Sequence, residues 1–120
     1  MTREFVYLPS FEKEWKSLGF SFEEFTKLEN YLLEHSQLPP VIAGTGGLRK
    51  LRWTIPGKGK RGGSRVIYID FVAFSKIYLI TAYPKSQKDN LTNAEKSSLK
   101  TLVKTLENEN LNNQESNNEY

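Results

Sequence analysis

Apolar residues alternate with polar ones in some stretches of this chain and recur at helical spacing in others. The first stretch, residues 3–8 (REFVYL), has the β-branched and aromatic composition of a strand, and Pro9 closes it. Ser10 is then placed to cap a short helix that ends at Gly19, because the apolar residues between them recur every three or four positions. These residues are Phe11, Trp15 and Leu18.

A second helix is predicted from Phe22 to about His35. Ser21 and Glu24 have the spacing of a capping box, in which each side chain accepts a hydrogen bond from the backbone N–H of the other residue. The apolar stripe of this helix consists of Phe22, Phe25, Leu28 and Leu32. Because only a short joint separates the two helices, we expect an antiparallel hairpin whose aromatic stripes belong to the core.

The middle of the chain predicts three consecutive strands. In residues 47–54 Leu, Leu and Trp stand among Arg and Lys, and residues 65–74 alternate in the same way after a loop at 56–63. After a tight turn at 73–76, residues 77–83 (IYLITAY) are almost continuously apolar, which is typical of a central strand. Short connections predict an antiparallel meander for the three strands.

The last element is a helix. Thr92 and Glu95 form a second capping-box pattern, and the apolar stripe that follows runs as far as Leu106. Residues 107–120 are rich in Asn and Glu without periodicity, which predicts an acidic disordered tail. The predicted fold is therefore α+β, in the order β-α-α-β-β-β-α. An N-terminal helical hairpin packs on a mostly antiparallel four-stranded sheet, and one domain spans residues 1–106.

Composition narrows the classes of function. The 120 residues suit one domain, and no apolar run approaches the roughly 20 residues that a membrane helix needs. The N-terminus lacks the apolar region of a secretory signal. The absence of cysteine excludes disulfides and thiolate chemistry and suits a reducing cytoplasm. A structural zinc site is not expected, because the chain has no cysteine and one histidine to act as ligands. No metal or cofactor is expected.

Positive charge is concentrated in residues 44–68. This stretch holds seven cations, no acidic residue and seven of the eight glycines of the chain. The net charge of +3 understates the asymmetry, because the predicted tail carries four Glu and no Lys or Arg. Cations on backbone with few side chains favour a polyanionic partner, and phosphate is the first to consider. A solvated hairpin tip is the alternative interpretation.

Two phosphate-binding motifs match this stretch by accident. Residues 57–62 satisfy G-x-G-x-x-G, but a β-rich segment follows them where the dinucleotide fingerprint requires a helix. A P-loop is excluded because Arg61 stands where the Ser or Thr for magnesium belongs.

The remaining chemistry is catalysis by cations. The Glu side chains lie on predicted helices as solvated faces, His35 at a helix end is better suited to a structural role, and the serines have no neighbouring base. Closely set Lys and Arg can stabilise the phosphate dianion formed when an RNA 2′-hydroxyl attacks its own backbone. Arg52 and Arg65 would be held by strands, but plain RNA binding explains the same residues equally well.

Three segments carry a resemblance to a known family. GTGGLRKLRW, GKGKRGGSRVIY and IYLITAYPKSQKDNLT are similar to the RelE/HigB family of type II toxins, closest to its HigB-like branch. The resemblance covers nearly the whole chain and implies the small α+β toxin fold. It also implies a ribosome-dependent endoribonuclease that cuts mRNA in the A site of the 30S subunit. Its partner would be a cognate antitoxin, usually a helix-turn-helix protein, so that DNA is contacted only through the complex.

The resemblance assigns roles to individual residues. The catalytic cations would be Lys50, Arg52, Arg65 and Lys85, which hold the scissile phosphate. Contacts to RNA would come from Arg49, Lys58, Lys60, Arg61, Tyr83 and Lys88. The tyrosine that many relatives place after the last catalytic cation has no counterpart here, so no general base is assigned.

Two other functions stay open on the sequence. A gyrase poison of the ParE type shares the architecture but lacks this cation set. A non-catalytic RNA- or ribosome-binding module would use the glycine-rich stretch only to follow phosphates.

Overall fold

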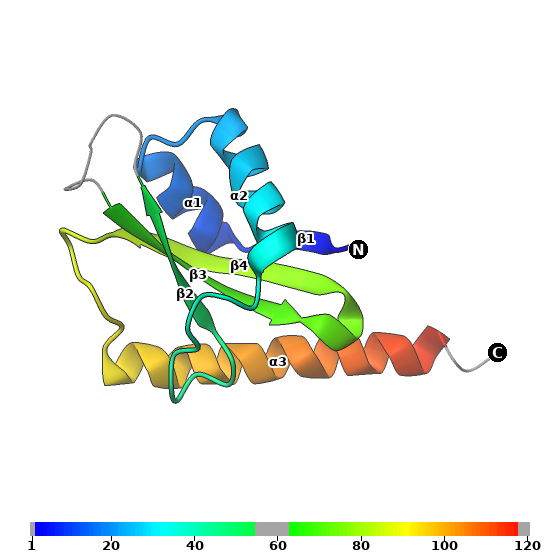
Figure 1. Ribbon diagram of the computed structural model, residues 1–120. Helices are drawn as coiled ribbons and strands as arrows, with labels where there is room; N and C mark the ends of the chain where they lie inside the picture. The colour runs from blue at the N-terminus through cyan, green and yellow to red at the C-terminus, as the bar shows by residue number, and fades with distance from the viewer. Residues whose placement is uncertain (1, 55–62, 118–120) are drawn as a thin grey trace.

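The computed structural model describes residues 2–54 and 63–117, with side chains as far as residue 114. Within this part of the chain, four strands form one sheet between two helical layers (Figure 1). Helices α1 (Pro9–Ser17) and α2 (Phe22–His35) lie on one side of the sheet. Helix α3 (Asn93–Asn117) runs along the other side. The predicted order β-α-α-β-β-β-α is confirmed.

The sheet has the order β1-β4-β3-β2. Strands β2 (Arg49–Thr54), β3 (Gly63–Phe71) and β4 (Lys76–Pro84) are antiparallel neighbours, as the meander predicted. Strand β1 (Glu4–Tyr7) pairs in parallel with the first half of β4. The predicted central position of β4 is therefore confirmed, and its apolar run reflects burial by helices on both faces.

An irregularity divides β4 into two halves. The register between β3 and β4 shifts between Ile67 and Tyr68, so that Ile67 pairs with Thr81 while Tyr68 pairs with Leu79. The extra residue, Ile80, changes which face of the sheet the second half of β4 presents. Ala82 consequently joins the core under α1 and α2, and Tyr83 joins the core under α3.

Two clusters of buried side chains make the core, one on each face of the sheet. Under the helical hairpin, the ring of Trp15 stacks on Phe20 and packs beside Phe11. Under α3, aliphatic residues of β3 and β4 contact Val103 and Leu106. The expectation that the aromatic stripes belong to the core is confirmed for Phe11 and Trp15, whereas Phe22 is largely exposed.

Two of the three predicted caps are wrong. Helix α1 begins at Pro9, whose fixed φ and missing N–H suit the first helical position, and Ser10 donates instead to Thr81. Ser21 is the N-cap residue of α2, but its side chain makes no cap hydrogen bond, because the N–H of Glu24 donates to the backbone carbonyl of Ser21. The carboxylate of Glu24 bonds to Lys27 and to Trp53. The second predicted capping box is confirmed. Thr92 and Glu95 exchange side-chain-to-backbone hydrogen bonds of 2.9 and 3.1 Å at the start of α3.

The predicted disordered tail is also wrong over most of its length. Helix α3 continues past Leu106 to Asn117. Its buried stripe is continued by a polar residue, Asn110, whose side-chain amide donates to the hydroxyl of Tyr78 at 2.9 Å and to the carbonyl of Leu106. The apolar pattern ends at Leu106, but the buried face of the helix does not. None of the helices in the described part of the chain has the length and apolar character needed to cross a membrane.

Candidate cationic site

The pairing register places the strongest candidates on one face of the sheet. Arg52 pairs with Arg65, and Arg65 pairs with Tyr83, so these three side chains lie on the same side of three neighbouring strands. Lys50 is two residues from Arg52 and therefore shares that face. This is the face that α3 covers, near the N-terminal end of the helix.

Arg65 is the best fixed of these cations. Only 4% of its side chain is exposed, although guanidinium groups are rarely buried without a partner. Its Nη2 donates to Oδ1 of Asp89 at 2.8 Å, and its Nη1 donates to the carbonyl of Ser64 at 3.3 Å. Because Arg65 lies within a paired strand, the sheet holds the position of the guanidinium.

The segment between β4 and α3, residues 85–92, closes over this face. Lys50 donates to Oδ1 of Asn90 at 2.8 Å and approaches the carbonyl of Asp89 at 3.5 Å. The hydroxyl of Tyr83 donates to that same carbonyl at 3.3 Å. Sequence reasoning gave no role to Asp89 or Asn90. The feature of the sequence that could have indicated a role is that Asp89 is the one acidic residue in the segment that follows the strands carrying the cations.

Tyr83 and Lys88 lie together at the side of the site. Tyr83 is buried, and the ammonium of Lys88 lies 4.9 Å from the centre of its ring. Lys88 also pairs with Glu95 at the start of α3. Burial raises the pKa of Tyr83 above its ordinary value. The phenol ring is therefore covered, and this arrangement does not support the predicted stacking of Tyr83 on a base.

The other predicted residues differ in where the structure places them. Arg52 and Lys85 are exposed at the edge of the site, and the backbone N–H of Lys85 donates to the carbonyl of Gly63 at 2.9 Å. Lys58, Lys60 and Arg61 lie outside the described residues.

Arg49 is not brought together with the others. It pairs with Tyr68, so its side chain lies on the opposite face of the sheet. Its guanidinium donates to the carbonyls of Gln37 and Pro39, at 3.0 and 2.7 Å, and to the side chain of Gln37. These contacts tie β2 to the segment after α2. The structure thus gives Arg49 a structural role and separates it from the cations on the α3 face.

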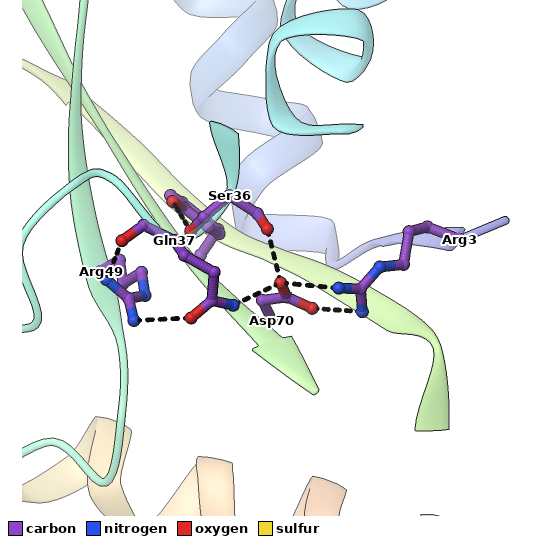
Figure 2. Close-up of polar contacts among 6 residues, drawn as sticks. Arg3, Ser36, Gln37, Arg49 and Asp70 are labelled. Carbon is purple, nitrogen blue, oxygen red and sulfur yellow. Dashed lines mark hydrogen bonds and ion pairs between the residues drawn. The ribbon is translucent and has the colours of Figure 1, made fainter. Parts of the chain in front are cut away.

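On that opposite face, Gln37 connects Arg49 to a buried carboxylate (Figure 2). The carboxylate of Asp70 is 1% exposed and pairs with both terminal nitrogens of Arg3, at 2.5 and 3.1 Å. It also accepts hydrogen bonds from Ser36 and Gln37, at 2.6 and 2.8 Å. The network joins the N-terminal residues, the end of α2 and the end of β3, and the cationic site on the other face has no part in it.

The charge of Asp89 is set by its cationic neighbours. The hydrogen bond from Arg65 lowers the pKa of the Asp89 carboxyl below its ordinary value, and the charges of Lys50 and Lys85 act in the same direction. The stabilisation from this pair is therefore present above the ordinary pKa and is lost as the pH falls through the lowered one.

A titration measures this effect directly. We expect the side-chain carboxyl carbon of Asp89, followed by NMR, to titrate below the ordinary range for aspartate. In the Arg65→Ala variant the midpoint should move upward, because the main hydrogen-bond donor is lost. An equal midpoint in the two proteins would contradict the pairing.

Among the residues that the structure describes, no three His, Asp or Glu side chains are grouped so that they could hold a metal ion. A groove of about 640 Å³ lies beside the site, between the start of α1, the second half of β4 and the first half of α3. Tyr83 and Lys88 form its end nearest the cations, and Ile80, Leu91 and Leu99 give it an apolar lining.

Comparisons with known proteins identify a family from the sequence and a similar fold among solved structures. The model of the family described as the RelE toxin of the RelE/RelB toxin–antitoxin system matches residues 43–118. Among solved structures, an arginine double mutant of the E. coli toxin RelE in the free state has a similar fold, with a TM-score of 0.51 and 14% sequence identity. The similarity covers 74% of this chain and 90% of that one. The family match includes nearly all of the residues that were predicted to be a separate tail.

Proposed function

Because this chain belongs to the RelE toxin family of toxin–antitoxin systems, we propose that it is an endoribonuclease that cuts mRNA in the ribosomal A site, as HigB-like toxins do. The observation that carries the proposal is the cation cluster on the α3 face. Lys50, Arg52 and Arg65 come from two paired strands, and Lys85 follows the third. The proposed antitoxin is a helix-turn-helix protein that neutralises the toxin.

The reaction needs charge stabilisation above all. The 2′-hydroxyl loses its proton as its oxygen bonds to the adjacent phosphorus, and the bond from phosphorus to the 5′-oxygen breaks as that oxygen takes up a proton. Negative charge accumulates on the phosphate during this exchange, and the products carry a 2′,3′-cyclic phosphate and a 5′-hydroxyl. Preorganised cations stabilise that charge without reorganising during the step. Arg65 is suited to this role because a planar guanidinium can present two donors to one phosphate and is always charged.

The other cations have supporting roles. The ammonium of Lys50 is suited to contact a second oxygen of the same phosphate, because its strand is the direct neighbour of β3. Arg52 and Lys85 are exposed and suited to bind flanking phosphates. Lys58, Lys60, Arg61 and Lys88 are proposed contacts to the RNA backbone.

The ribosome is needed because it fixes the geometry of the mRNA. Cleavage requires the 2′-oxygen, the phosphorus and the 5′-oxygen to lie in line, and free mRNA samples that arrangement rarely. A transcript held in the A site has lost most of this freedom, so the toxin needs to supply only the charge.

The test is primer extension on one defined mRNA, with programmed 70S ribosomes and without them. We expect a cut within the A-site codon only in the ribosomal sample, with a 5′-hydroxyl on the downstream fragment. Efficient cutting of the free transcript, with ribosome-bound mRNA left intact, would overturn the proposal. Tight ribosome binding with no cut in either sample would instead favour the non-catalytic binding module.

A further inference from the structure

We infer that Asp89 acts as a built-in occupant of the phosphate site, and that the RNA phosphate must replace its carboxylate on Arg65 before the toxin can engage its substrate. This inference concerns the regulation of the proposed ribonuclease site and rests on that function. It starts from the burial of Arg65, because a guanidinium that is only 4% exposed and already bonded to Asp89 cannot meet a phosphate while that carboxylate stays in place.

The carboxylate of Asp89 has the features of a phosphate substitute. It is an anionic oxygen group placed 2.8 Å from Nη2 of Arg65. The neighbouring oxygens also engage the second cation of the site, since Lys50 contacts the side-chain oxygen of Asn90 and the backbone carbonyl of Asp89. The segment thus satisfies the two cations proposed to hold the scissile phosphate.

The substitute is an incomplete one. Nε of Arg65 is buried and has no hydrogen-bond partner among the described residues. A buried donor without a partner is costly, and Asp89 reaches only Nη2. A phosphate can present two oxygens to the Nε and Nη2 edge of a guanidinium, so it can satisfy a donor that the carboxylate leaves unused.

The carboxylate of Asp89 is also able to move away from Arg65. The side chain of Asp89 is 55% exposed, so its carboxylate can move into water without disturbing the core. At Asp89 and Asn90 the remaining contacts with the sheet face are the hydrogen bonds from Lys50 and Tyr83. The two ends of the segment are fixed more firmly, by the bond from the N–H of Lys85 to Gly63 at one end and by buried Leu91 and the Thr92–Glu95 box at the other. The displacement that the exchange needs is therefore confined to the residues between these two ends.

The consequence is a minimum effective concentration that an RNA phosphate must reach in order to bind Arg65. The phosphate of a free RNA contacts the site only transiently and must compete with the tethered carboxylate of Asp89. A phosphate fixed in the A site competes at a high effective concentration. The substitution is an exchange of one anion for another, and no covalent bond is involved.

The experiment measures binding without cleavage. A short fluorescent RNA with 2′-O-methyl groups, which has no attacking hydroxyl, is titrated with the full chain at one fixed salt concentration. We expect Asp89→Asn to bind this RNA roughly tenfold more tightly than the unchanged protein, because the amide keeps the shape of the carboxylate but not its charge.

Glu14→Gln is the matched control. It removes an equal charge from the wall of the groove beside the site, but Glu14 has no ion pair among the described residues, whereas Asp89 is paired with Arg65. We expect a change below about twofold, from long-range electrostatics alone. Equal gains in Glu14→Gln and Asp89→Asn would overturn the inference, as would no gain in either.

A second measurement follows Asp89 itself. As the 2′-O-methyl RNA saturates the unchanged protein, the carboxyl carbon resonance of Asp89 should move to the position of an unpaired aspartate. Binding that leaves this resonance unmoved would also overturn the inference. Neither readout involves cleavage. If the protein passes both tests but does not cut mRNA on ribosomes, the proposed function is wrong and the inference about Asp89 stands. If it cuts mRNA in the A site but Asp89→Asn does not bind RNA more tightly, only the exchange of the Asp89 carboxylate for phosphate is wrong.

Discussion

Replacing Arg65 with alanine is expected to lower ribosome-dependent cleavage by about a hundredfold or more, the loss typical when one preorganised donor to the transition state is removed. The effect should be on the rate of the chemical step. Several exposed cations remain to hold the RNA backbone, so ribosome binding should weaken only a few-fold. Single-turnover cleavage on programmed ribosomes, beside a direct measurement of ribosome affinity, separates the two quantities.

Two comparisons make this result specific. Lys104→Ala removes one positive charge from an exposed position on α3 and should leave the cleavage rate nearly unchanged. The Arg65→Ala protein should also stay folded, because Asp89 is left with an exposed carboxylate that water can solvate. If cleavage and ribosome affinity fell by equal factors, Arg65 would be a binding contact and the catalytic assignment would be wrong.

Replacing Asp70 with alanine is expected to lower the free energy of unfolding by about 3–5 kcal/mol, because it leaves the charge of Arg3 buried without its partner. Ser36 and Gln37 lose their acceptor in the same step. Urea unfolding should show a lower midpoint with an unchanged slope, which indicates a change in stability and not in compactness.

The control for this prediction is an exposed ion pair. Glu34 lies beside His35, and 77% of its side chain is exposed, so Glu34→Gln should change the unfolding free energy by less than about 1 kcal/mol. If Asp70→Ala unfolded at the same urea concentration as Glu34→Gln, the network in Figure 2 would have no part in holding the sheet to α2.

The alternation of residue types was sufficient to predict the strands that carry the site. Lys50 and Arg52 alternate with Leu51 and Trp53, and the structure places the two pairs on opposite faces of β2. The same periodicity placed Arg65 on the neighbouring strand, whereas its catalytic role was predicted from the resemblance to the toxin family. Strand alternation is a local property, so a single sequence reveals it.

The contacts that complete the site are not local. The extra residue at Ile80 reverses the alternation within β4, and no composition signal marks it, so the position of Tyr83 under α3 could not be predicted. The contact of Asp89 with Arg65 joins residues 24 positions apart. It depends on how the segment after β4 turns back across the sheet, which the pattern of residue types does not encode.

A comparable limit explains the error at the C-terminus. Asn is a weak helix former, and Asn110 looks like solvent-exposed sequence until its partner is known. The hydroxyl of Tyr78 supplies that partner from the middle of β4. The burial of a polar residue can be predicted from a sequence only when its hydrogen-bond partner can be predicted as well.

The parallel pairing of β1 with β4 has a kinetic consequence. The hairpin of β3 and β4 closes through a short turn at residues 72–75, whereas β1 must find a partner at residues 76–79, across most of the chain. Because distant pairing is the slow part of folding, we expect the β3–β4 hairpin to form early and β1 to dock late. During synthesis, α1 and α2 leave the ribosome before the sheet that buries them exists, so each new toxin molecule must pass through a stage with its aromatic face uncovered.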